Sequence, residues 1–83
     1  MVRVTGRVVE RFTKRPISGA TVNIGGAVGY TDASGNFSVE ANQGKQDLSI
    51  TSPGYNTWYR AMNFKRALNR VGVLTMDSEI RAL

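Results

Sequence analysis

Short runs of alternating apolar and polar residues, each ended by glycine or proline, constrain the fold of this chain most. The run VRVTGRVVE at 2–10 places Val2, Val4, Gly6 and Val8 on one side and polar residues on the other. A period of two is typical of a strand that is buried on one face. Similar runs recur at intervals of about 8–12 residues, the spacing that is typical of a small β-sandwich.

Seven such runs predict a small all-β, antiparallel sandwich of transthyretin-like or immunoglobulin-like type. We expect strands at 2–10, 20–24, 27–31, 36–41, 46–52, 55–62 and 70–76. Beyond the first strand, we expect these residues to face inward: Ala20, Val22, Ile24, Phe37, Val39, Leu48 and Ile50. The segment 60–70 has a helical alternative, because Ala61, Phe64, Leu68 and Val71 are also spaced as on one face of a helix. We favour a strand that ends near residue 62.

Two glycine-containing turns are predicted with specific geometry. Gly25-Gly26 permits the positive φ angles of a tight hairpin. The sequence SPGY at 52–55 fits a type II turn that leads into Tyr55, because Pro53 presets its own φ and Gly54 supplies the positive φ that follows.

The octet YTDASGNF at 30–37 fits a type I turn. Asp32 at the first position can accept hydrogen bonds from backbone N–H groups, and Gly35 at the fourth can become left-handed. A turn closed in this way predicts a bulged hairpin between antiparallel strands. Thr31 enters the turn and Phe37 leaves it toward the core, so we interpret Asp32 as structural.

The composition argues against most kinds of active site. The 83 residues contain no Cys and no His, so zinc, haem, Ser-His-Asp and Cys-His chemistry lack their usual groups. A calcium ion takes about six to eight oxygen ligands and usually several carboxylates, whereas the octet offers only Asp32. The other acidic residues are scattered along the chain: Glu10, Glu40, Asp47, Asp77 and Glu79. We predict no enzyme activity, no cofactor and no metal.

The chain is basic, with a net charge of +5 from eleven Lys and Arg against six Asp and Glu. A candidate binding surface combines aromatic and basic residues: Trp58, Tyr59, Arg60, Lys65, Arg66 and Arg70. Aromatic rings beside cations are typical of nucleic-acid-binding surfaces. The simpler interpretation is a basic soluble surface, with Trp58 in the core or at a protein contact.

Two further features could govern association with other chains. Trp58, Tyr59, Met62 and Phe64 could together form an apolar face for self-association or for docking to another domain. Arg3, Arg7 and Arg11 would protect the first strand against unwanted pairing if that strand lay at a sheet edge.

Several motifs, taken in order, resemble those of the carboxypeptidase regulatory-like domains, transthyretin-like β-sandwiches related to collagen-adhesin B-type repeats. The motifs are Val4-Thr5-Gly6-Arg7-Val8, Pro16-Ile17-Ser18-Gly19-Ala20 with Val22, Thr31-Asp32 with Gly35 and Phe37, Gly44, and Gly54-Tyr55. The resemblance is strongest over 2–57 and implies a single domain over 1–83. It also implies a non-catalytic module attached to other domains, frequently extracellular or at the cell surface.

Two properties of related proteins do not carry over to this chain. Transthyretin-like hydroxyisourate hydrolases depend on His, which is absent here. The internal Lys–Asn bond of some collagen-adhesin domains is not expected, because Lys14, Lys45 and Lys65 lie in polar or turn contexts.

The start MVRVTGRVV lacks the apolar stretch of a signal peptide, and no run approaches the roughly 18–20 apolar residues of a membrane span. The chain is therefore either cytoplasmic or one domain of a longer exported protein. We predict a structural or interaction module of a larger surface, exported or assembly-forming protein, with other protein domains or further copies as partners. The alternative is a small protein that binds a polyanion, such as nucleic acid, or a carbohydrate through Trp58–Arg70.

Overall fold

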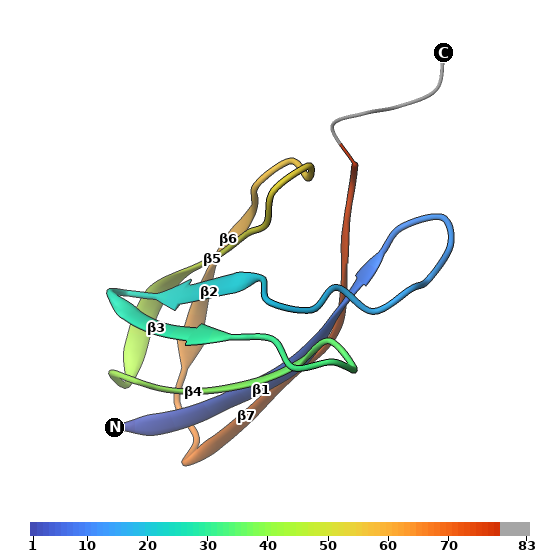
Figure 1. Ribbon diagram of the computed structural model, residues 1–83. Coiled ribbons are helices and arrows are strands. Elements are labelled where there is room, and N and C mark those ends of the chain that lie inside the picture. Colours follow the sequence, from blue (N-terminus) through green and yellow to red (C-terminus); the bar gives the residue numbers. More distant parts are fainter. Residues whose placement is uncertain (79–83) are drawn as a thin grey trace.

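The computed structural model describes residues 1–78, which form seven β-strands in two sheets (Figure 1). The strands are β1 (Val2–Glu10), β2 (Thr21–Ile24), β3 (Ala27–Tyr30), β4 (Asn36–Ala41), β5 (Gly44–Thr51), β6 (Trp58–Phe64) and β7 (Leu68–Met76). One sheet has the order β4-β1-β7 and the other the order β3-β2-β5-β6. The predicted all-β sandwich is confirmed. Within the described range, no helix is long and apolar enough to cross a membrane.

The hydrophobic core lies between the two sheets. The apolar residues that the alternation placed inside are all buried: Val2, Val4, Val8, Ala20, Val22, Ile24, Phe37, Val39, Leu48 and Ile50. Phe64 of β6 and Met76 of β7 complete the core from the last third of the chain. Each large buried side chain contributes roughly 1.5–3 kcal/mol relative to an exposed one. This burial and backbone pairing hold together a chain that has no cysteine.

Strand β1 pairs with β4 in antiparallel fashion and with β7 in parallel fashion. The parallel pair departs from the antiparallel arrangement that we expected. It arises because the turn at 65–67 reverses the chain and moves it into the opposite sheet, so β7 runs in the same direction as β1. A bulge interrupts this pair between Thr5 and Arg7, where β7 holds one extra residue and Gly72 adopts a φ of 79°.

The segment 60–70 forms the end of β6, a turn and the start of β7, so the helical alternative is wrong. Strand β6 pairs with β5 from Trp58, opposite Ile50, to Phe64, opposite Gly44. This continuous pairing carries β6 two residues beyond the end that we expected. The backbone pairs and the burial of Phe64 outweigh the helical spacing of the apolar residues.

The octet at 30–37 forms a type I turn that connects the two sheets. The N–H of Gly35 donates to the Asp32 carbonyl at 2.9 Å, and the φ of Gly35 is 79°. Asp32 Oδ1 accepts hydrogen bonds from the N–H groups of Ser34 and Asn36, each at 2.9 Å. The expected hairpin is wrong, because β4 pairs with β1 and not with β3. The turn is a corner between layers.

Buried contacts fix the chain on both sides of this corner. Thr31 is 5% exposed; its hydroxyl donates to the Ile17 carbonyl at 2.6 Å and accepts from the Ala20 N–H at 2.9 Å. Phe37 packs opposite Gly6, where a Cβ atom would lie 2.7 Å from the Phe37 ring. The corner is therefore tied to the segment that precedes β2 and to the middle of β1.

The two glycine-containing turns have the geometry expected for them. Gly25 and Gly26 have φ angles of 57° and 97° in the two-residue hairpin between β2 and β3. In the turn before β6, the Tyr55 N–H donates to the Ser52 carbonyl at 3.1 Å, and Gly54, which follows Pro53, has a φ of 84°. These values match a type II turn. Tyr55 is half-buried against the core.

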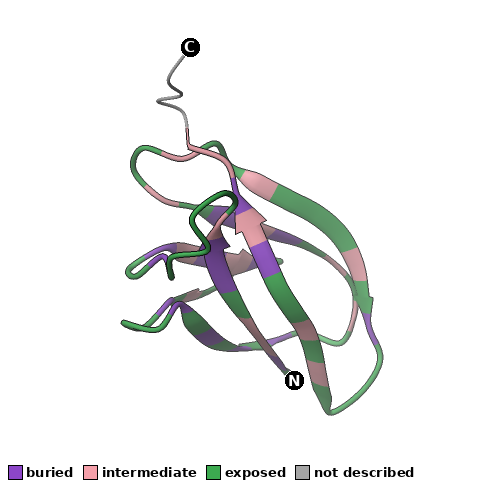
Figure 2. Cartoon of the chain, turned by 90° about the vertical axis from the view of Figure 1, so that its right-hand side faces the viewer, coloured by how far each residue is buried: buried purple, intermediate pink, exposed green. Residues whose placement is uncertain are grey.

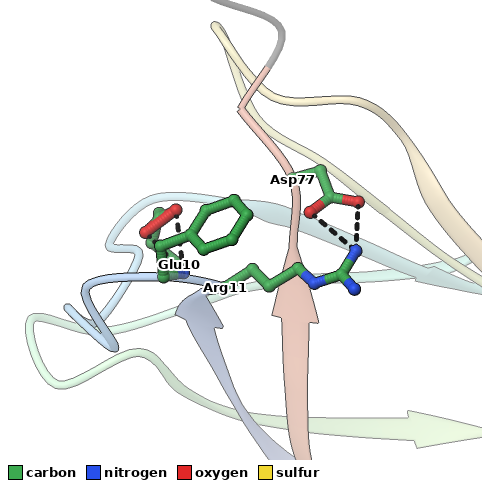
Figure 3. Close-up of polar contacts among 4 residues, drawn as sticks. Glu10, Arg11 and Asp77 are labelled. Atoms are coloured by element: carbon green, nitrogen blue, oxygen red, sulfur yellow. Dashed lines mark hydrogen bonds and ion pairs between the residues drawn. The ribbon is translucent and has the colours of Figure 1, made fainter. Parts of the chain in front are cut away.

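Glu10 organises the loop that follows β1. Its carboxylate accepts hydrogen bonds from the N–H groups of Thr13 at 2.8 Å and Phe12 at 3.0 Å. Because these bonds favour the charged carboxylate, they lower the pKa of Glu10 below its ordinary value of 4.5. The next residue, Arg11, points toward the carboxylate of Asp77, with its Nη1 3.3 Å from Asp77 Oδ2 (Figure 3).

The arginines of the first strand do not protect a sheet edge, because β1 is the central strand of its sheet. Arg3 Nη2 forms an ion pair with Glu40 Oε1 at 2.6 Å, which links β1 to β4. Arg7 Nε donates to the Ser34 carbonyl at 3.0 Å, within the corner. These side chains instead connect β1 to its neighbours, and the expectation of edge protection is wrong.

Asp32→Ala is expected to lower the free energy of unfolding by about 0.5–2 kcal/mol, as the loss of a helix cap does, because two backbone N–H groups lose their acceptor. Asp32→Asn keeps an oxygen acceptor and should lose less. Urea denaturation of the three proteins measures both changes. Equal stability of the wild type and the alanine variant would contradict this role for Asp32.

Glu10 is expected to make stability depend on pH. Its pKa is lower in the folded chain than in the unfolded chain, so its contribution is complete above the unfolded pKa. That contribution is lost as the pH falls through the folded pKa. Urea denaturation at several pH values should show a stability difference between wild type and Glu10→Gln at neutral pH that disappears in acid. A difference that stays constant with pH would contradict the assignment.

Candidate functional site

A cleft opens between β6 and β7, which are neighbouring edge strands of the two sheets. Its volume is about 680 Å³. The lining residues come from both strands and from the turn between them: Arg60, Ala61, Met62, Asn63, Phe64, Arg66, Leu68, Asn69, Arg70 and Val71. Figure 2 shows that the buried part of β7 lies toward its C-terminal end, whereas exposed and half-buried residues alternate in the half that lines the cleft.

The cleft exists because only one side of the sandwich is closed. On the opposite side β3 and β4 come close together, since Gly29 has no side chain and a Cβ atom there would lie 2.6 Å from Val39 Cγ2. Met62 and Val71 are half-buried against the core from the cleft side. The cleft therefore has an apolar floor at the margin of the core.

Arginine supplies the charge of the cleft. Arg60, Arg66 and Arg70 line it, and no lining residue is acidic. Among the residues that the structure describes, none of these three takes part in an ion pair. Arg60 instead lies over the ring of Trp58, 5.4 Å from its centroid. Like charges without counter-ions repel one another, so the cleft favours a ligand with negative charge.

No acidic residue of the described range forms an ion pair with these arginines. Four acidic side chains are held in turns or ion pairs outside the cleft: Glu10, Asp32, Glu40 and Asp77. Asp47 is exposed on β5, and Glu79 lies outside the described residues. Residues 1–78 contain no cluster of acidic side chains that could hold a metal ion. The three lysines, Lys14, Lys45 and Lys65, are exposed.

The binding surface predicted from the sequence divides between the two faces of β6. Trp58 and Arg60 lie on the inner face, where Trp58 is half-buried against the core. Tyr59 points the other way and is 73% exposed. Lys65 lies in the turn and does not line the cleft. The fold thus places the three arginines along one cleft but separates the two aromatic rings, because successive residues of a strand point to opposite faces.

The apolar face expected from Trp58, Tyr59, Met62 and Phe64 does not form. Phe64 is 2% exposed and belongs to the core. Tyr59 lies on the opposite face from the other three residues, for the same reason of strand geometry. Only Trp58 and Met62 remain half-buried on the face that they share with Phe64, and Arg60 lies between them on the strand.

Sequence reasoning missed Asn63 and Asn69 as cleft residues and considered Leu68 only for a helix. Asn69 Nδ2 donates to the Arg66 carbonyl at 2.7 Å and so fixes the turn at the end of the cleft. The sequence did contain one indication, since Trp58, Met62 and Phe64 recur at even spacing. A strand, a turn and a second strand across 60–70 would have placed the cleft residues of both strands close together. The local sequence, however, does not indicate that both strands lie at sheet edges.

The chain is similar to solved structures of longer proteins, whereas no curated protein sequence matches it. Chains from two interface mutants of a type II Cohesin-X-Dockerin complex of Acetivibrio cellulolyticus match with TM-scores of 0.77 and 0.74 and identities of 25% and 26%. The matches cover 94% and 92% of this chain, which spans only 58% and 57% of theirs. A protein of unknown function from Bacteroides fragilis shares the fold, with a TM-score of 0.67 and 17% identity over 99% of this chain and 29% of that one.

Residues 3–76 match the sequence model of the carboxypeptidase regulatory-like domain. The match continues beyond residue 57, where the recognisable motifs end, and includes both strands that form the cleft. It agrees with the two-sheet sandwich and with the structural neighbours. The chain therefore belongs to the family of carboxypeptidase regulatory-like domains.

Proposed function

We propose that this domain is a non-catalytic interaction module of a larger exported or assembly-forming protein, and that it binds an acidic protein partner in the cleft between β6 and β7. One observation carries the proposal: Arg60, Arg66 and Arg70 line this cleft without any carboxylate. A partner with negative charge would relieve the repulsion among them.

The comparisons support an interaction role in a longer protein. The family is that of a regulatory-like domain. The similar Acetivibrio cellulolyticus chains come from a Cohesin-X-Dockerin complex, an assembly of proteins, and this chain corresponds to little more than half of each. A domain of this shape is thus used within larger chains that assemble with others.

The shape of the cleft favours a protein partner over a nucleic acid or a glycan. A surface for single-stranded nucleic acid combines cations with exposed aromatic rings on which bases stack. Here Trp58 is half-buried beneath Arg60, and Tyr59 lies on the other face of β6. An apolar floor that includes Met62 and Val71, with a basic rim, is the arrangement expected of a protein interface.

A second copy of this chain is a poor occupant of the cleft. The chain carries a net charge of +5, and the arginines of one cleft would face those of another copy. Like charges juxtaposed at an interface oppose association. An acidic segment from a different protein avoids this repulsion.

Charge reversal in the cleft is expected to abolish most of the affinity for an acidic peptide. The probe is a short fluorescent peptide of alternating Glu and Val, and its binding is followed by fluorescence anisotropy at low salt. Arg66→Glu and Arg70→Glu should each weaken binding about five- to tenfold, because attraction becomes repulsion. Arg15→Glu makes the same change of charge in the loop after β1, outside the cleft, and should have an effect of less than about twofold.

Three results would overturn the proposal. The first is the absence of binding by the Glu-Val peptide. The second is an equal loss for Arg15→Glu, which would indicate a general charge effect without a site. The third is tighter binding of single-stranded DNA than of the peptide, with the same dependence on Arg66 and Arg70, which would favour the polyanion alternative.

A further inference from the structure

We propose that the acidic partner binds as an added β-strand along the free edge of β7, with its backbone paired to Leu68 and Arg70. This inference rests on the proposed function and specifies how the partner is held. In strand addition, backbone hydrogen bonds supply much of the affinity and alternate side chains supply the selectivity.

The register of β7 identifies which of its backbone groups are free. Arg3 lies opposite Leu68, and the Arg3 N–H donates to the Ala67 carbonyl at 2.9 Å. In a parallel pair, a strand uses every second residue to bond its neighbour, so residues 67, 69 and 71 face β1. The N–H and C=O groups of Leu68 and Arg70 therefore point to the opposite edge. No strand described in the structure pairs with that edge.

The start of this edge is held by hydrogen bonds before any partner arrives. All three carbonyl groups of the turn at 65–67 accept hydrogen bonds: Lys65 from Gln43 Nε2 at 3.2 Å, Arg66 from Asn69 Nδ2 at 2.7 Å, and Ala67 from the Arg3 N–H. An ordered edge loses little conformational entropy when a strand is added. The edge is thus prepared for pairing.

Charge and backbone geometry define what fits there. Arg66 and Arg70 lie on either side of Leu68 in the sequence, and all three line the cleft. An added strand would place alternate side chains on its two faces, so acidic side chains in an extended segment would lie near these arginines. The bulge at Gly72 ends the regular part of the edge, which limits pairing to a short stretch.

The other sheet edges are less suited to this role. Strands β3 and β4 close against each other where Gly29 meets Val39. Strand β6 also borders the cleft and has a free edge, but of the three cleft arginines only Arg60 lies on it, over the Trp58 ring. Pairing with β6 is a separate outcome that the experiment below can identify.

Amide hydrogen exchange tests the inference residue by residue. NMR would follow exchange in the free protein and in the protein saturated with the Glu-Val peptide. In the free protein, the amides of Leu68 and Arg70 should exchange fast, and those of Asn69 and Val71 slowly. Binding should slow the exchange of Leu68 and Arg70 at least about tenfold, because each gains a hydrogen bond.

The possible outcomes separate this inference from the proposed function. If the peptide binds but protects the amides of β6, or leaves the amides of Leu68 and Arg70 unprotected, strand addition to β7 is overturned. The proposed binding of an acidic partner would still stand. Failure of the peptide to bind would overturn both.

A pair of variants tests the same inference from the protein side. Leu68→Pro removes one N–H from the free edge and leaves the bonds to β1 in place; proline is tolerated at the first residue of an edge strand. It should weaken peptide binding about tenfold. Leu68→Val keeps the N–H and should bind within about twofold of wild type. Equal binding by both variants would contradict the inference.

If Leu68→Pro fails to fold, the peptide provides the matching test. N-methylation of its alternate backbone nitrogens should abolish binding for one set of positions and not for the other, because only one set faces β7. Equal effects for both sets would overturn strand addition.

Discussion

Strand β1 is the element on which the rest of this sandwich depends. It pairs with β4 along one side and with β7, the last strand, along the other. Val4 and Val8 of this strand have no exposed surface, so β1 also contributes to the centre of the core. Nearly the whole chain separates β7 from β1 in the sequence. The three-stranded sheet is therefore complete only after the two ends of the chain have come together. Such distant pairing slows folding relative to local contacts.

The same pairing determines where the molecule is open. Because β7 pairs with β1 along one edge, its other edge has no neighbouring strand in its own sheet. Strand β6 is likewise the last strand of the opposite sheet, and it lies on the same side of the sandwich as β7. At the far side, a glycine at position 29 lets β3 and β4 meet. The sandwich is therefore closed along one margin and open along the other. The open margin carries arginine beside its apolar floor, and charged side chains along an exposed edge oppose pairing with another copy of this basic chain.

Local patterns in the sequence predicted local structure well. Alternation located the strands and the inward residues, and the turn around Asp32 and Gly35 has the hydrogen bonds and the φ angle that its residues require. Pairing was not predictable in this way. The octet at 30–37 forms a corner between the sheets, and β7 runs parallel to β1. Arg60, Arg66 and Arg70 line a cleft. These outcomes depend on which distant strand each segment joins, and local spacing does not specify that choice.

The distribution of arginine gives the cleft its functional interest. A basic surface that served only solubility would need no particular arrangement of its charges. In this chain, Arg3 and Arg11 form ion pairs, and Arg7 is held by a backbone carbonyl. The arginines of the cleft have no acidic neighbour among its lining residues, although the described part of the chain contains five acidic side chains. Part of the positive charge that the fold leaves without ion pairs thus lies beside its unpaired strand edges, where a partner could satisfy both.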